Sequence, residues 1–83
     1  MEQIIVEFHD MCRRKTYDLQ LPSDLTGREL VKALVRAYDL PLDMNDPAQL
    51  YLRAKNPIAF IEGNTTLEEL GISDGTMIYF DPR

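Results

Sequence analysis

The chain has one cysteine, one histidine and no tryptophan among its 83 residues. A single cysteine, Cys12, excludes an internal disulfide, a zinc site made only of cysteines and a four-cysteine iron–sulfur cluster. No apolar run approaches the ~18 residues that a membrane-spanning helix needs. The glycine-rich loop that holds phosphate and the aspartate-rich loop that binds calcium are also missing. These absences predict a chain without a cofactor or a metal site.

Positive charge is scarce as well. Nine Lys and Arg residues stand against fourteen Asp and Glu residues, which gives a formal net charge of -5. An acidic chain has little general affinity for nucleic acid or for anionic lipid. Residues 1–7 lack the basic segment that begins a signal peptide. We therefore expect a cytoplasmic protein that neither binds nucleic acid nor inserts into a membrane, with one domain over residues 1–83.

Alternating apolar and polar side chains predict β-strands in five segments: residues 3–8, 16–21, 50–55, 58–61 and 77–80. A short polar turn joins the first two segments into a hairpin. Asn56-Pro57 and Gly63-Asn64 are turn sequences, which separate the later strands.

Residues 26–38 carry the signals of a helix. Thr26 is followed three residues later by Glu29, which is the spacing of a capping box, and Leu25 and Leu30 flank this cap as a hydrophobic staple. The helix is predicted to end at Asp39-Leu40-Pro41, because the residue before proline avoids helical angles. Apolar residues at helical spacing predict its buried face: Leu30, Val31, Leu34, Ala37 and Tyr38.

The last part of the chain predicts a short helical turn that leads into the final strand. Leu67, Leu70 and Ile72 are predicted to point inward, and Gly71 ends the turn. The order of elements is then ββαββ, a short helical turn, and β. This order predicts an α+β fold, in which one helix packs across a mixed sheet of four to five strands and both hide their apolar faces in one core.

This arrangement is the β-grasp. The element order, the capped helix and the closing segment, residues 66–75, resemble ubiquitin, and more closely the YukD/EsaB family of bacterial ubiquitin-like proteins associated with type VII secretion. The resemblance implies a stand-alone domain that is not conjugated. It also implies an accessory role in the secretion apparatus and a protein partner, such as a membrane-bound component of that apparatus.

A ubiquitin-like modifier or a sulfur carrier is the alternative function. Either one needs a C-terminal Gly-Gly tail, whereas this sequence closes with Asp81-Pro82-Arg83. We therefore expect no conjugation. A third alternative is a domain detached from a larger polypeptide, whose sheet would pack against a sibling domain. The identity of the partner and the oligomeric state stay open at this point.

The strongest catalytic candidates are His9 and Cys12, three residues apart around the first turn. A Cys–His pair can form an activated nucleophile, and Arg13 and Arg14 would favour the thiolate. We expect both side chains on a small exposed turn, with no cleft and no third group to orient the imidazole. With Asp10 they would supply only three of the four ligands of a zinc site. We therefore predict no catalytic residues and no enzyme.

Protein binding is the function that the pattern favours. Alternation assigns Leu50, Leu52, Ile78 and Phe80 to the core, and it leaves a candidate docking set on the outer face of the sheet: Tyr51, Arg53, Lys55, Met77 and Tyr79. Tyr and Arg are enriched at binding hot spots, and Met adapts to irregular surfaces. The corresponding face of ubiquitin is aliphatic, whereas this one is aromatic and basic. Ordinary cross-strand pairs on a solvated face are the alternative, and the basic turn Arg13-Arg14-Lys15 is a second, weaker candidate.

Overall fold

The chain follows the predicted order of strands and helix over residues 2–81, the part that a computed structural model describes. The elements are β1 Gln3–Asp10, β2 Lys15–Pro22, α1 Gly27–Tyr38, a short 3-10 helix η1 Pro47–Gln49, β3 Leu52–Lys55, β4 Ala59–Ile61 and β5 Met77–Phe80. β1 is longer than predicted. β3 begins later, because the backbone N–H of Leu50 is bonded to the carbonyl of Pro47 in the last turn of η1.

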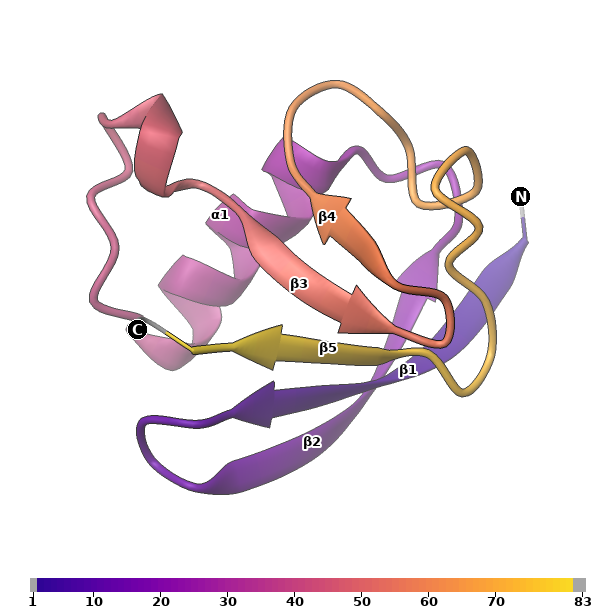
Figure 1. Ribbon diagram of the computed structural model, residues 1–83, viewed down its shortest axis with the longest axis horizontal. Coiled ribbons are helices and arrows are strands. Elements are labelled where there is room, and N and C mark those ends of the chain that lie inside the picture. Colours follow the sequence, from indigo (N-terminus) through magenta and orange to yellow (C-terminus); the bar gives the residue numbers. More distant parts are fainter. Residues whose placement is uncertain (1, 82–83) are drawn as a thin grey trace.

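The five strands form one mixed sheet in the order β2-β1-β5-β3-β4. β1 and β5, the first and last strands of the chain, run parallel at its centre, and every other neighbouring pair is antiparallel. Figure 1 shows β5 between β1 and β3. The C-terminal strand therefore joins the N-terminal hairpin to the β3–β4 hairpin, as the β-grasp requires.

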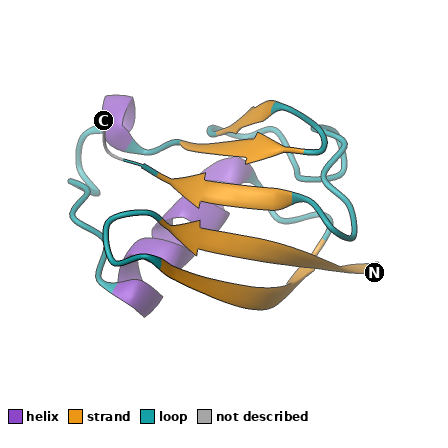
Figure 2. Cartoon of the chain, turned by 60° about the horizontal axis from the view of Figure 1, so that its bottom comes forward, coloured by secondary structure: helices purple, strands orange, loops and turns teal. Residues whose placement is uncertain are grey.

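α1 covers one face of the sheet and leaves the other open, as Figure 2 shows. The core between helix and sheet includes the residues predicted from alternation, Leu50, Leu52, Ile78 and Phe80, all of which are buried. Leu67 and Ile72 of the closing turn are also buried, and Leu70 is half-buried. The predicted separation of an inner and an outer sheet face is confirmed.

One prediction for the buried face of α1 was wrong. Ala37 is exposed, whereas Val35, which the prediction omitted, is buried. A helix turns by about 100° per residue, so Val35 lies within about 40° of Val31, in the stripe that Leu30 and Leu34 continue. Ala37 lies on the side of Leu30 that faces away from Leu34, and it therefore falls outside that stripe.

Two capping boxes fix the segments that cross over the sheet. In the predicted one, Thr26 Oγ1 accepts from the backbone N–H of Glu29 (3.2 Å), and Glu29 Oε1 accepts from the backbone N–H of Thr26 (2.9 Å). Thr66 and Glu69 repeat this arrangement in the closing turn, with distances of 3.1 and 3.0 Å. Because Thr26 and Thr66 also form a β-bridge, the two caps lie side by side.

Candidate functional site

The outer face of the sheet carries a row of side chains that crosses all five strands. Strand register pairs Phe60 with Arg53, Arg53 with Tyr79, Tyr79 with His9, and His9 with Thr16. Their neighbours along each strand point to the core, because side chains alternate between the two faces. Arg53 therefore stands between Phe60 and Tyr79 in this row. The predicted pair Arg53 and Tyr79 does lie together.

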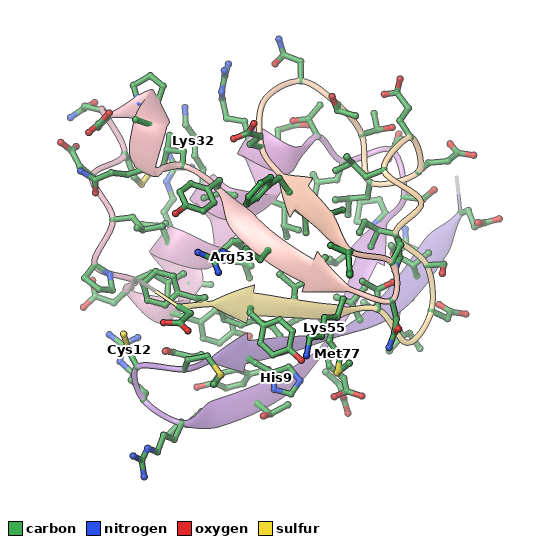
Figure 3. The ribbon with its side chains drawn as sticks, in the orientation of Figure 1. His9, Cys12, Lys32, Arg53, Lys55 and Met77 are labelled. Carbon is green, nitrogen blue, oxygen red and sulfur yellow. The ribbon has the colours of Figure 1, made fainter. Side chains whose placement is uncertain are left out.

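A second row lies one step along the strands. It contains Lys55 opposite Met77, and Met77 opposite Glu7. The two rows are connected: Tyr79 Oη donates to Met77 Sδ at 3.4 Å, and Lys55 Nζ lies 5.8 Å from the centroid of the Tyr79 ring. That position is within the range of a cation–π contact. Figure 3 shows His9, Lys55 and Met77 close together, with Arg53 further along β3.

Exposed apolar side chains border this face on the side of β4. Phe60 is 59% exposed and Ile58, in the turn before β4, is 90% exposed. Tyr51, which lies just before β3, packs edge-on against Phe60 with ring centroids 5.8 Å apart. All five predicted docking residues are thus on or beside one surface. Phe60, Ile58 and Tyr51 therefore form an exposed apolar border of the sheet face.

Sequence reasoning missed Phe60, Ile58 and His9 as members of this surface. The signal for Phe60 was present, since Ile61 is buried and alternation along β4 then turns Phe60 outward. His9 was missed because β1 continues to Asp10, beyond its predicted end. The turn position of Ile58 carries no alternation signal.

An open groove, which we call the β3–β4 groove, crosses this surface and has a volume of about 590 Å³. Its size falls in the range of about 300–1,000 Å³ that is usual for ligand clefts. Both basic and apolar side chains line it. Its lining includes Met11, Arg53, Lys55, Ile58, Phe60, Tyr79 and Asp81.

The predicted catalytic candidates are not brought together. His9 lies in β1 on the outer face, where Nε2 is 3.1 Å from Glu7 Oε1, Nδ1 is 3.4 Å from Thr16 Oγ1, and the ring is 4.9 Å from that of Tyr79. The expectation that His9 sits on the exposed turn was wrong. Cys12 does lie on that turn, away from His9 (Figure 3). Within residues 2–81, no cluster of His, Cys, Asp and Glu side chains could hold a metal ion.

One cation of the basic turn, the second docking candidate, is bound within the chain. Arg13 Nη1 donates to Asp10 Oδ2 (3.0 Å) and to the carbonyl of Tyr38 (2.7 Å), and Nη2 donates to the carbonyl of Asp39 (2.8 Å). These carbonyls are at the C-terminal end of α1, where the helix dipole favours a cation. Asp10 is only 1% exposed and needs this partner. Arg13 therefore fastens the hairpin to the helix, and Arg14 and Lys15 remain exposed.

The sequence profile of a family described as "WXG100 protein secretion system (Wss), protein YukD" matches residues 4–80. The chain belongs to this family. Among curated protein sequences, none matches the chain. The YukD-family assignment therefore comes from the profile, which spans both rows of the outer face and the whole core.

Solved structures confirm the ubiquitin-like β-grasp of this YukD-family chain. A protein designed de novo on the basis of ubiquitin is 22% identical, with 95% of this chain and 87% of that chain covered and a TM-score of 0.66. The UBL domain of Plasmodium falciparum Dsk2 is 16% identical (94% and 97% covered, TM-score 0.64). Caldiarchaeum subterraneum ubiquitin is also 16% identical (99% and 98% covered, TM-score 0.62). Identity this low establishes the fold alone.

The YukD-family chain has no helix within residues 2–81 that is long and apolar enough to cross a membrane. The family description links it to a protein secretion system. The aromatic and basic side chains of both rows lie together on the outer face of the sheet.

Proposed function

We propose that this YukD-family chain is a non-conjugated protein-interaction module, without enzymatic activity, that serves as an accessory component of a bacterial type VII secretion system. It docks a protein partner through the outer face of its sheet. The observation that carries the proposal is the grouping of Tyr51, Arg53, Tyr79 and Phe60 on the face opposite α1. Binding hot spots are rich in Tyr and Arg, and they centre on side chains that a partner can desolvate.

The architecture supports docking by a preformed surface. Arg53 and Tyr79 stand on neighbouring strands in the middle of the sheet, so little backbone freedom is lost when a partner binds. We further propose that residues 1–83 act as one domain in the cytoplasm. From there the module would reach a membrane-bound component of the secretion apparatus without itself entering the membrane.

The test is a pull-down from native cells with the double variant Tyr51→Ala and Tyr79→Ala. Loss of both rings should abolish capture of the secretion component that the unmodified chain captures. The two substitutions remove ring contacts at the surface worth about 0.5–1.5 kcal/mol each, so the variant should still unfold cooperatively. Gln20→Ala is the matched control, because Gln20 is exposed on β2, away from the aromatic group.

Undiminished capture by the folded double variant would refute this docking face. Mass spectrometry of the captured material also decides between adaptor and modifier. A non-covalent complex agrees with the adaptor, whereas a bond between the C-terminus of this chain and a lysine of another protein would establish the alternative. Pro82 and Arg83, on which the expectation of no conjugation depends, lie outside the described residues.

A further inference from the structure

The β3–β4 groove combines free positive charge with apolar walls. Within residues 2–81, neither Arg53 nor Lys55 lies within ion-pair distance of a carboxylate; Arg13 pairs with Asp10, and His9 Nε2 contacts Glu7 Oε1. Both cations are exposed, and both line the groove together with the apolar side chains of Ile58 and Phe60. Arg53 and Lys55 therefore offer two positive charges at one groove, in a chain with a net charge of -5.

The acidic groups on the same face do not cancel these cations. Glu7 is engaged by the imidazole of His9 at 3.1 Å. Asp18 lies on β2, opposite Glu7, and is separated from β3 by β1 and β5. Asp81 lines the groove itself, so two positive charges stand against one negative charge in the lining. The positive charge is therefore concentrated over β3, between the apolar border and the centre of the sheet.

We infer that the β3–β4 groove binds an acidic segment of another protein, in which carboxylates stand next to a bulky apolar side chain. The apolar side chain packs against Phe60 and Ile58, and the carboxylates pair with Arg53 and Lys55. This inference rests on the proposed function, since it names the chemistry of the partner at the same face. Arg53 offers a planar fork that suits a carboxylate, and a partly desolvated pair beside apolar side chains is stronger than one in open water.

The spacing of the two cations fits such a segment. Arg53 and Lys55 are alternate residues of one strand, so their Cα atoms are about 6.6 Å apart. Carboxylates at alternate positions of an extended segment have the same spacing, and carboxylates one turn apart on a helix are nearly as far from each other. A segment of either kind can satisfy both cations at once.

The same face is less suited to nucleic acid or to a second copy. Aromatic rings can stack bases, but such sites also need a positively charged groove that follows several phosphates. Here two cations stand in a chain of net charge -5. A second copy would carry that same net charge, so its approach is opposed by long-range repulsion. These two occupants are kept as outcomes of the test.

The experiment selects peptides from a random phage-displayed library on the full 83-residue chain, with counter-selection on Arg53→Glu. We expect the selected peptides to combine Asp or Glu with Leu, Ile, Phe or Trp. Fluorescence anisotropy of the strongest peptide should show at least tenfold weaker binding to Arg53→Glu, a smaller loss with Arg53→Lys, and no change with Gln20→Ala. Phe60→Ala should also weaken binding, and added salt should weaken it several-fold because the pairs are partly exposed.

Charge exchange gives the decisive readout. A peptide whose carboxylates are replaced by Lys should not bind the unmodified chain, and it should bind the double variant Arg53→Glu and Lys55→Glu with affinity restored to within a few-fold. Selected peptides without acidic residues, or binding that Arg53→Glu leaves unchanged, would overturn the inference. Preferential binding of a labelled oligouridine, or a concentration-dependent dimer in sedimentation that Phe60→Ala abolishes, would overturn it in favour of the other occupants.

The two proposals can fail separately. If the Tyr51 and Tyr79 double variant loses its cellular partner but Arg53→Glu retains it, the outer face docks a partner that is not acidic, and only the present inference is lost. If the double variant keeps its partner, the proposed docking face itself is wrong. Arg53 is exposed, so Arg53→Glu should keep the unfolding transition of the unmodified chain.

Discussion

The substitution Gly27→Ala tests how the helix is seated in the fold. Gly27 is the first residue of α1 and is buried against the backbone that follows β4. A Cβ at this position would meet the backbone nitrogen of Glu62 and would lie 2.6 Å from its carbonyl oxygen and 2.8 Å from its carbonyl carbon. Real Cβ atoms essentially never approach closer than 3.0 Å. The helix or the segment after β4 must therefore move.

Two opposing effects set the size of the change. Alanine is the better helix former, which contributes about 1 kcal/mol in favour of the variant at most. Against this, overpacking a tight site costs about 1–3 kcal/mol. The displacement also strains the hydrogen bonds from the N–H groups of Gly27 and Arg28 to the carbonyls of Thr65 and Gly63, both 2.9 Å long, and each is worth about 1 kcal/mol. We expect a net loss of about 2 kcal/mol in the free energy of unfolding.

Urea and thermal unfolding followed by circular dichroism measure this loss. For a domain of this size, the midpoint of thermal unfolding should fall by about 8–16 °C. Ala33→Gly is the matched control, because Ala33 is exposed in the middle of the same helix and its loss should cost only about 1 kcal/mol of helix propensity. If Gly27→Ala is as stable as the unmodified chain, or more stable, the close approach of α1 to Glu62 is wrong.

Two further predictions concern the caps and the hairpin. The N–H and hydroxyl groups of a threonine hold the pKa of Glu29 below the usual 4.5, and the pKa of Glu69 is lowered in the same way. The stability that each carboxylate adds is therefore fully present above pH 4.5, and it is lost as the pH falls through the lowered pKa. Urea unfolding of the double variant Glu29→Gln and Glu69→Gln should accordingly show a flatter loss of stability below pH 4.5, and an unchanged acid profile would contradict the capping role. Arg13→Ala should lower the free energy of unfolding by about 1–3 kcal/mol, because it leaves the buried carboxylate of Asp10 without its cation. Arg14 is exposed, so Arg14→Ala should have little effect on the free energy of unfolding. Equal effects of the two substitutions would refute the fastening role of Arg13.

Several parts of the fold were predictable because they depend on local chemistry. The cap at Thr26, the alternation along β5 and the turn at Asn56-Pro57 are each encoded by neighbouring residues, and each was confirmed. The exchange of Val35 for Ala37 was missed. Both residues lie at the margin of the apolar stripe, where the position of the sheet decides which one is covered.

The candidate surface was predictable only in part. Alternation placed Arg53 and Tyr79 on one face, but it could not show that His9 stands beside Tyr79, since β1 and β5 are separated by almost the whole chain. The partners of Arg13 could not be predicted for the same reason. The sequence shows Arg13 only as one of three cations at a turn. Its partners are the carbonyls of Tyr38 and Asp39, at the end of a helix that is distant in the sequence.

The amino-acid sequence by itself determined the elements, their faces and the ubiquitin-like order, because capping, turn formation and side-chain alternation act over a few residues. Tertiary structure alone decided which side chains share the outer face. Parallel pairing of β1 with β5 brings His9 to Tyr79, and antiparallel pairing of β3 with β4 brings Phe60 to Arg53. Strand register is set by the packing of the whole core, so the composition of the surface follows from contacts that are distant in the chain.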